Sequence, residues 1–260
     1  MPKNLNPVNS SQTMVIPSRD GALAQLESFL ERVPSYEKNR SYDRPGHADV
    51  SQLSRWIRYR VVTEGECIER VLSRYPFAMA EKFIQEVVWR TYWKGWLEMH
   101  PGVWARFVSD RERLIERYRD DEGLHAAYAG RTSLIFFNDW VRELIDTGYL
   151  HNHTRMWFAS VWIFTLRLPW QLGAAFMYRH LLDGDPASNT LSWRWVGGLH
   201  TRGKIYVAKP GNIRTYSEGR WNPKEGELAV DPAPLPFEEP DGVAPFRKVE
   251  ALSPSSDSLV

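Results

Sequence analysis

The densest group of chemically useful side chains surrounds Gly184, in the run LLDGDPASNTLSWRW. Asp183 and Asp185 flank that glycine, so a turn there could direct two carboxylates into one space. Asn189 and Trp193 follow four residues apart and would share one face of the next helix. Carboxylates, an amide and an indole could then border one ligand, although the Asp-Gly-Asp run alone is also typical of a plain connection between two helices.

A second group lies in the run TGYLHNHTRMWF. Asn152 and Arg155 are three residues apart and would share a helical face. Arg155 could form a hydrogen-bonded ion pair with Asp183 at the edge of the same cavity, or it could be an ordinary surface arginine. His151 and His153 alternate instead of lying four residues apart, so we expect no metal site from them.

A third group lies in the run EKFIQEVVWRTYWKGW. Glu86, Trp89, Arg90 and Trp93 fall on one helical face. An exposed face with a helical Glu-Arg pair is one interpretation. Two indoles among four positions argue against plain solvent exposure, because a ring system that size favours burial or stacking.

Two hydroxyl groups open a fourth group, VSQLSRWIRYR. Ser51 and Ser54 stand where a helix is expected to begin, and the free backbone N–H groups of a helix start attract phosphate. Helix capping alone is the alternative. The arginines that follow could contact phosphates or could form a solvated helix face.

Composition limits the elements that could position these groups. The chain has 260 residues, 43% of them apolar, and twelve tryptophans, which favours one Trp-rich core. Its net charge of +1 is too small to indicate a nucleic-acid binder by itself. Cys67 is the only cysteine, and the sequence has no long apolar run and no secretory signal. We therefore expect a cytoplasmic protein with no membrane segment.

Apolar spacing predicts an all-α, helical-bundle fold. We expect a helical domain over residues 21–215, between an N-terminal tail at 1–20 and a Pro/Ser-rich C-terminal tail at 216–260. Thr63 and Glu66 have the spacing of a capping box. Pro34 should end the first helix, and residues 35–49 should form a loop. Further helices are expected at about 77–100, 103–118, 135–146, 152–166, 170–182 and 189–196.

Taken in chain order, the runs VSQLS, QEVVWRTYW, TGYLHNHTRM and LLDGDPASNTLSWRW resemble the FAD-binding domain of the photolyase/cryptochrome superfamily. Each run alone is weakly specific, but four in order and at roughly the family's spacing are specific. Members normally begin with an α/β domain that holds an antenna chromophore. The likeness here begins near residue 36, so the chain resembles the short, FAD-domain-only photolyase-like proteins and we expect no antenna chromophore.

The resemblance implies FAD as the cofactor and a set of contacts to it. Arg155 and Asp183 would border the flavin ring, Asp185 its polar edge, and Asn189 would face flavin N5. The serine segment, residues 51–54, would contact the pyrophosphate and ribityl chain. The residues implied to contact FAD are Tyr36, Ser51, Gln52, Leu53, Ser54, Arg90, Asn152, Arg155, Asp183, Gly184, Asp185 and Asn189.

The resemblance also implies substrate and electron-transfer roles. Trp193 and Trp170 match the first two members of an electron-hopping chain, and Tyr118 is the aromatic nearest to the expected third position. His153 stands where the family usually has arginine. The residues implied to be catalytic are Glu86, Asn189, Trp193 and Trp170, and those implied to bind the lesion are Glu86, Trp89, Asn152, His153, Met156 and Trp195.

The function implied is light-dependent repair of cyclobutane pyrimidine dimers in ultraviolet-damaged DNA. Asn152 and Met156 favour the cyclobutane lesion over the (6-4) lesion. We expect single-stranded DNA to be preferred, because it avoids much of the cost of unpairing the damaged bases. Two alternatives stay open: a cryptochrome-like blue-light photoreceptor without repair activity, and a helical binding module with a degenerate flavin pocket.

Overall fold

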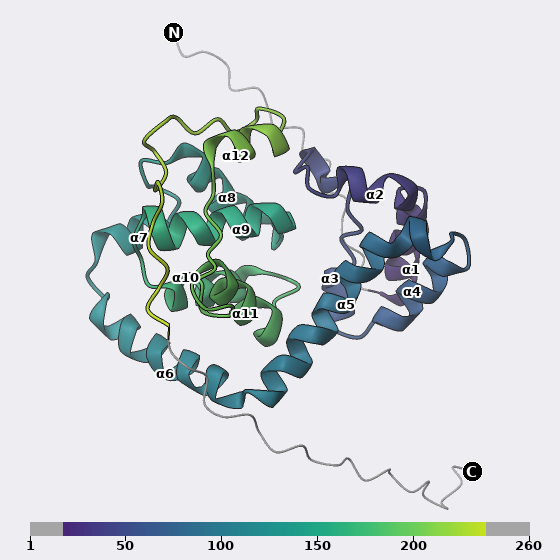
Figure 1. Ribbon diagram of the computed structural model, residues 1–260, viewed down its shortest axis with the longest axis horizontal. Helices are drawn as coiled ribbons and strands as arrows, with labels where there is room; N and C mark the ends of the chain where they lie inside the picture. The colour runs from purple at the N-terminus through teal and green to yellow at the C-terminus, as the bar shows by residue number, and fades with distance from the viewer. Residues whose placement is uncertain (1–17, 238–260) are drawn as a thin grey trace, which may run out of the picture.

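The computed structural model describes residues 18–237, and within that range the secondary structure is helical, with no strand (Figure 1). The all-α prediction is confirmed. Most of the helices that the sequence predicts end within about two residues of the expected limit, because the apolar positions recur at helical spacing. The helices at 33–39, 122–128 and 210–216 were not expected. Among the described helices, none combines the length and the apolar character needed to cross a bilayer.

The first group of helices packs around a small core near the N-terminus. Phe29 and Phe83 meet at 4.8 Å between ring centroids, and Leu26 is buried beside them. The capping box predicted at Thr63 and Glu66 is present at the start of α4. The group contains α1 (Arg19–Leu30), α2 (Val33–Asn39), η1 (Pro45–His47), α3 (Ser54–Arg58), α4 (Glu64–Leu72) and the first half of α5 (Phe77–Met99).

The second group of helices packs around a larger core that accounts for much of the tryptophan. Trp140, Trp157, Trp162 and Trp193 are fully buried there. The group contains α6 (Pro101–Arg117), α7 (Glu122–Tyr128), α8 (Ile135–Thr147), α9 (Asn152–Ser160), the π-helix η2 (Val161–Thr165), α10 (Trp170–His180), α11 (Pro186–Val196) and α12 (Pro210–Tyr216).

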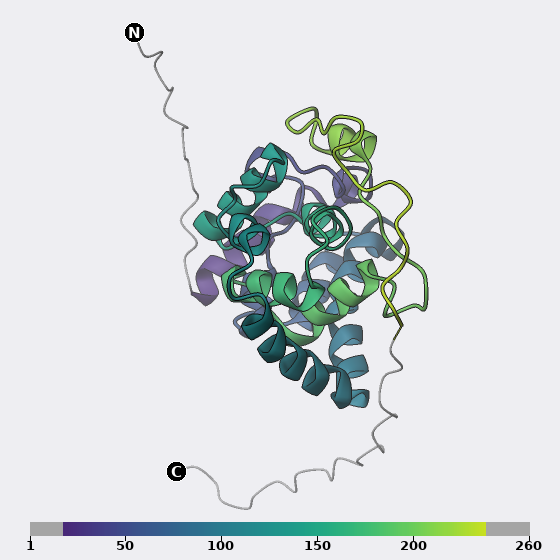
Figure 2. The ribbon, with the colours of Figure 1, turned by 90° about the vertical axis from the view of Figure 1, so that its left-hand side faces the viewer.

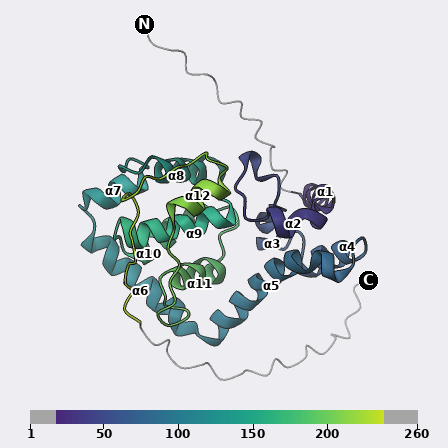
Figure 3. The same cartoon turned by 45° about the horizontal axis from the view of Figure 1, so that its top comes forward.

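Helix α5 is shared by the two groups, as Figures 1 and 3 show. Its first half contributes Phe83 and Val87 to the first core. Its second half runs beside α11 and leads into α6, and no residue from 88 to 100 is fully buried. One 23-residue helix therefore sets the separation of the two cores.

Pro34 does not end the helical structure, which corrects the expectation of a loop over residues 35–49. Pro34 lies in the first turn of α2, and the helix continues to Asn39. Proline is tolerated in a first turn because the backbone N–H that it lacks would have no partner inside the helix. The loop begins only after α2.

The domain boundary expected at residue 215 is too early. Ser217, Trp221 and Leu228 are buried against the second core, and the Trp221 indole N–H donates to Asp139 Oδ2 at 3.2 Å. Figure 2 shows this yellow-green segment running along one edge of the molecule. The other residues expected in tails, 1–17 and 238–260, lie outside the described residues.

Candidate functional site

The residues singled out around Asp183 lie where α3, α5, α9 and α11 approach one another. Arg155, on α9, donates from its NH2 group to Asp183 Oδ2 at 2.9 Å, and from Nε to the Leu150 carbonyl at 2.9 Å. Asp183, in the turn before α11, is only 6% exposed. The ion pair expected from the sequence is therefore present, and the backbone of Leu150 fixes the arginine that makes it.

The Asp183 carboxyl is held ionised inside the protein. Burial alone would raise its pKa, but the Arg155 guanidinium, Ser54 and Arg90 together outweigh burial, so the pKa lies below its usual range. Asp183 Oδ1 is buried and has no hydrogen-bond partner. An ionised oxygen without a partner is costly, so this atom is suited to accept from a bound group.

Asp185 and Gly184 shape the turn beside that pair. Asp185 caps α11 by accepting from the Ser188 N–H at 2.9 Å, and its other oxygen lies 3.5 Å from Arg90 and 3.7 Å from Lys94. A Cβ on Gly184 would lie 2.8 Å from the Tyr178 carbonyl oxygen, so a side chain there would force the turn to shift. The turn thus requires glycine for space.

Asn189 is buried on α11 with its amide orientation fixed. Its Nδ2 donates to the Ala174 carbonyl of α10 at 2.9 Å. The side-chain oxygen is then the end available to an additional donor. An acceptor in this position would suit the N–H of a reduced flavin ring, which is the role that the resemblance in the sequence implies for Asn189.

The serine segment is only partly directed at this site. Ser54 begins α3 and acts on Asp183, as described above. Ser51 accepts from the Leu53 N–H at 3.4 Å, and Leu53 itself is buried in the first core. Gln52 has a left-handed backbone, with φ of 53°, and its amide donates to the Gly46 carbonyl at 2.9 Å. The Gln52 side chain therefore stabilises the loop around Gly46.

Tyr36 lies in the first core. Its ring packs edge-on against Phe29 and Phe83, each at 5.6 Å between centroids. Burial raises the pKa of its hydroxyl above the ordinary range. The structure supports a packing role for this residue, and its implied contact with the cofactor stays a prediction.

The residues expected to bind the lesion differ in their exposure and in whether they already have protein partners. Trp89 is 47% exposed, and Asn152 is exposed at the start of α9. Glu86 forms an ion pair with Arg40 of the loop after α2, a partner that sequence spacing could not reveal. Met156 is half-buried.

His153 and Trp195 are held by their own neighbours. His153 Nδ1 lies 2.9 Å from the Ser41 carbonyl, and its Nε2 lies 3.4 Å from the Tyr206 hydroxyl. Trp195 is half-buried and stacks on Tyr206 at 5.7 Å. Both ring nitrogens of His153 therefore have protein partners.

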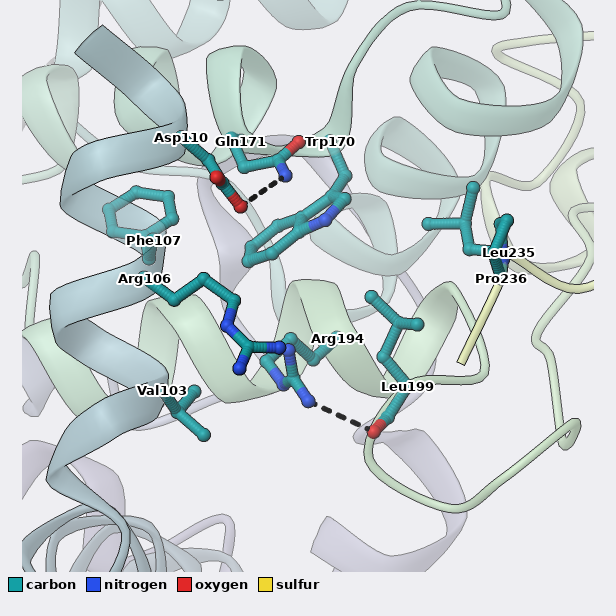
Figure 4. Close-up of a pocket in the computed structure, with 10 residues that line it drawn as sticks. All are labelled: Val103, Arg106, Phe107, Asp110, Trp170, Gln171, Arg194, Leu199, Leu235 and Pro236. Atoms are coloured by element: carbon teal, nitrogen blue, oxygen red, sulfur yellow. Dashed lines mark hydrogen bonds between the residues drawn. The ribbon is translucent and has the colours of Figure 1, made fainter. Parts of the chain in front are cut away.

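The tryptophans expected to carry electrons lie in the second core. Trp193 packs edge-on against Trp162 at 6.3 Å, and its indole N–H is buried without a hydrogen-bond partner. Trp170 stands at the start of α10 beside Phe107 of α6, at 5.5 Å, and Phe107 contacts the half-buried Trp104 at 5.3 Å. Both Trp170 and Phe107 line a cavity of about 170 Å³ (Figure 4).

These ring contacts were not expected from the sequence. Among the described residues, Tyr118 makes no contact with another aromatic ring, whereas Phe107 and Trp104 lead from Trp170 toward the surface. The signal that could have found them is their three-residue spacing on α6, which puts both on one face.

Arg55 and Tyr149 form a further part of the site. The guanidinium groups of Arg55 and Arg155 lie 5.4 and 5.2 Å from the ring centroid of the buried Tyr149. Burial lowers the pKa of Arg55 despite the nearby acids. Arg58 donates to the Gly184 carbonyl at 2.5 Å, so it fastens α3 to the turn before α11 instead of standing in solvent.

Several buried polar atoms at this junction have no hydrogen-bond partner, and they fit a cofactor with a polar ring edge and phosphates. They include both donors and acceptors, and they come from both helical groups. Such a set satisfies a bound polar molecule better than it satisfies the protein alone. The atoms are Arg55 Nε, Arg90 Nε and NH2, Asp183 Oδ1 and Ser188 Oγ.

Comparison with known proteins agrees with this geometry. Residues 83–221, more than half of the chain, match the family described as the FAD binding domain of DNA photolyase. The chain belongs to this family. FAD is therefore its cofactor. The unpartnered atoms around Asp183 would suit it, and their assignment as FAD contacts stays a prediction.

Curated relatives of this photolyase-family chain are named deoxyribodipyrimidine photo-lyase. A protein from Thermus thermophilus is 31% identical over 210 residues, which cover 79% of this chain and 49% of the relative. A protein from Escherichia coli is 27% identical over 192 residues, 71% of this chain and 40% of the relative. The chain thus spans less than half the length of these relatives.

Solved structures in the family share the fold. A class III photolyase from Agrobacterium tumefaciens superimposes with a TM-score of 0.63 at 24% identity, covering 79% of this chain and 44% of that one. A Synechocystis cryptochrome gives 0.66 at 20% identity, covering 76% and 43%. Photolyases and a cryptochrome are thus both similar in fold to this chain.

Proposed function

We propose that this photolyase-family domain repairs cyclobutane pyrimidine dimers in ultraviolet-damaged DNA under blue light. The observation that carries the proposal is the buried Arg155–Asp183 pair next to Asn189, whose amide is held by Ala174. In a chain of this family, these groups suit a reduced flavin: a fixed charge pair beside the ring and a neutral acceptor for its N–H.

The protein groups would bind and orient, because the difficult chemistry belongs to the cofactor. When bound, reduced flavin supplies the electron that splits the cyclobutane ring after light absorption. Trp89 and Trp195 would stack against the extruded bases, as aromatic faces do. Glu86 would accept a hydrogen bond from the pyrimidine edge, and Arg40 would hold its carboxylate in place. Trp193 and Trp170 would lie on the route by which electrons reach the cofactor.

The proposed substrate is a dimer in single-stranded DNA. A pyrimidine dimer in a single strand is already free of its complement, so the protein would need less binding energy to extrude it. The small net charge of the chain is consistent with a substrate that is captured by stacking more than by long-range attraction.

Repair can be tested with FAD-loaded, fully reduced protein and an ultraviolet-damaged oligonucleotide under blue light. We expect dimers to disappear with the wild type and with Glu98→Gln, an exposed carboxylate on the same helix. Glu86→Gln should slow repair at least about tenfold, since a positioned hydrogen bond to developing charge is worth this much or more. Full retention of dimers by the reduced wild type would refute the proposal.

A second candidate is a cryptochrome-like photoreceptor without repair activity. Two observations favour it: Glu86 is already ion-paired to Arg40, and both His153 nitrogens have protein partners, so less of the lesion pocket is free. This candidate predicts photoreduction of FAD through Trp193 and Trp170 with no dimer loss. It also predicts equal affinity for damaged and intact DNA.

A further inference from the structure

The second half of α5 carries a row of aromatic rings that extends beyond the proposed lesion pocket. We define the aromatic stripe as Trp89, Tyr92, Trp93 and Trp96 of α5, together with His100 directly after α5 and His200 from the loop after α11. We propose that the stripe binds the single strand of nucleic acid that flanks the substrate, with bases stacked on its rings. The inference rests on the proposed function for the identity of the strand.

The rings of the aromatic stripe are arranged as a continuous surface. Trp89 stacks on Trp93 at 5.4 Å with 28° between planes, and Trp96 stacks on His100 at 3.9 Å with 13°. His200 joins the two pairs, because it lies 4.8 Å from Trp93 and 4.9 Å from Trp96. The protein thus orders the rings before any ligand arrives, which reduces the entropy lost on binding.

The aromatic stripe is not part of either core. Trp89 and Tyr92 are 47% and 44% exposed, and neither hydrophobic cluster includes a residue between 88 and 100. Adjacent exposed aromatic rings cost solvation free energy, and a patch of this kind usually marks an interaction site. The row begins at Trp89, which also belongs to the proposed lesion pocket, so a strand leaving that pocket would meet it directly.

Charge around the aromatic stripe favours a polyanion. Arg202 and Lys204, two and four residues after His200, are exposed, and neither forms an ion pair with an acid among residues 18–237. Glu86, the acid on the same face of α5, is neutralised by Arg40. Burial lowers the pKa of His200, so its ring is neutral near pH 7 and stacks without charge.

These features select single-stranded nucleic acid over other occupants. A second copy of the chain docking on the same face would bring two basic loops together, which opposes association. A duplex hides its base faces, whereas a single strand offers a π-face at every base and phosphates between them. The stripe rises about 16 Å along the helix axis, room for a few nucleotides.

The test compares oligothymidylates of increasing length, without damage, for binding to the FAD-loaded full chain by fluorescence anisotropy. We expect affinity to rise with length in the wild type. Tyr92→Ala combined with Trp96→Ala should weaken binding of a twelve-residue strand at least about tenfold, because each lost stack is costly. Phe77→Ala, 58% exposed at the other end of α5, should bind like the wild type.

A second variant leaves the rings in place. Arg202→Gln combined with Lys204→Gln should weaken binding and lower the slope of log affinity against log salt concentration by about 1.4, since each phosphate contact with a single strand releases roughly 0.7 counterion. The flavin absorbance of every variant shows that it is folded and loaded. Because this variant is confined to an exposed loop, it tests the proposal even if the ring variant loses structure.

The outcomes separate this inference from the proposed function. Repair of a minimal dinucleotide dimer should be the same in all variants, since it would contact Trp89 but would not reach the substituted residues. If the dinucleotide is not repaired by any protein while the variants still lose affinity for long strands, the repair proposal fails and this one stands. Unchanged affinity in both variants overturns the inference. It is also overturned if the wild-type protein forms a homodimer and the ring variant is a monomer.

Discussion

Asp183 and Arg155 show how much one residue pair depends on its surroundings. The aspartate is buried and ionised, and its charge is balanced mainly by a guanidinium that is itself held by a backbone carbonyl. In the unfolded chain the two residues are apart, so neither stabilises the charge of the other. The pair therefore ties the start of α9 to the turn before α11, and it does so where the flavin is expected to lie.

Asp183→Asn should destabilise the protein and reduce its FAD content. The substitution keeps the shape of the side chain but leaves Arg155 without its charge partner, and breaking a buried pair in this way costs about 3 kcal/mol. Urea unfolding and the ratio of flavin to protein absorbance measure the two effects. Glu31→Gln, which removes the partner of exposed Arg74, is the matched control and should change neither. Wild-type flavin content in Asp183→Asn would contradict the assigned role.

For single residues, the sequence predicted which chemical groups lie at the site better than it predicted which residues they contact. The residue types of Arg155 and Asp183 suggested a charge pair, which is present, whereas the hydrogen bond that fixes the Asn189 amide was not predicted. The ion pair of Glu86 with Arg40 could not be predicted, because the two residues are far apart in sequence and no periodicity joins them. The loop that follows Tyr36 differs from the family's, the ring of Tyr36 lies in the first core, and its contact with FAD stays a prediction.

Among the helices, α10 and α11 pack most closely where α10 has no side chain. A Cβ on Gly173 would lie 2.4 Å from the Trp193 ring and 2.8 Å from that of Trp162. Glycine is normally unfavourable inside a helix, so its presence here reflects the space that two indoles require. The position of Trp193, and with it the start of the proposed electron route, depends on this contact.

Gly173→Ala should therefore destabilise the protein, although alanine favours a helix by about 1 kcal/mol over glycine. Overpacking in a core costs about 1–3 kcal/mol, and here the atoms that must move belong to rigid rings. Thermal unfolding measures the balance, and tryptophan fluorescence reports any movement of the indoles. Gly95→Ala on exposed α5, where a Cβ would meet no atom, should be stabilising instead. A stable Gly173→Ala protein would show that the two helices can separate at little cost.

Most of the helices could be predicted from apolar spacing and capping residues, as the ends of α5, α8 and α10 show. The failures have local physical causes. Pro34 was expected to end a helix, but it fits the first turn of the next one. The segment around Trp221 has no periodicity of its own, because its stability comes from contacts with Trp140 and Asp139.

On the scale of the whole molecule, a buried charge network joins the two helical groups. His47, between α2 and α3, lies 3.1 Å from Asp43 and 2.9 Å from Glu143 of α8. Burial alone would lower the pKa of His47, but these two carboxylates outweigh it and raise the pKa to about 9. Asp43 also accepts from Thr154 and lies 2.9 Å from Arg220, so one aspartate holds segments from distant parts of the chain.

Stability should consequently fall in mildly alkaline solution. His47 keeps its proton in the folded protein up to pH about 9, whereas the unfolded chain releases it near 6.5. The stability due to its charge is complete below pH about 6.5 and is lost as the pH rises to about 9, a change of roughly 3 kcal/mol. Urea unfolding at several pH values measures this slope. His47→Gln should flatten it, and an equally steep slope in that variant would assign the loss to another group.

Because α5 is a single unbroken helix that belongs to both helical groups, the fold should tolerate a change in its number of residues less well than a substitution along it. One inserted residue would rotate everything after it by about 100° and displace it by about 1.5 Å. Trp93 and Trp96 would then turn away from His200, and α6 would leave the second core at a new angle. Substitutions along the exposed half of this helix should be tolerated by the fold, whereas a change in its residue count would alter the spacing of the two cores and so the width available to the flavin.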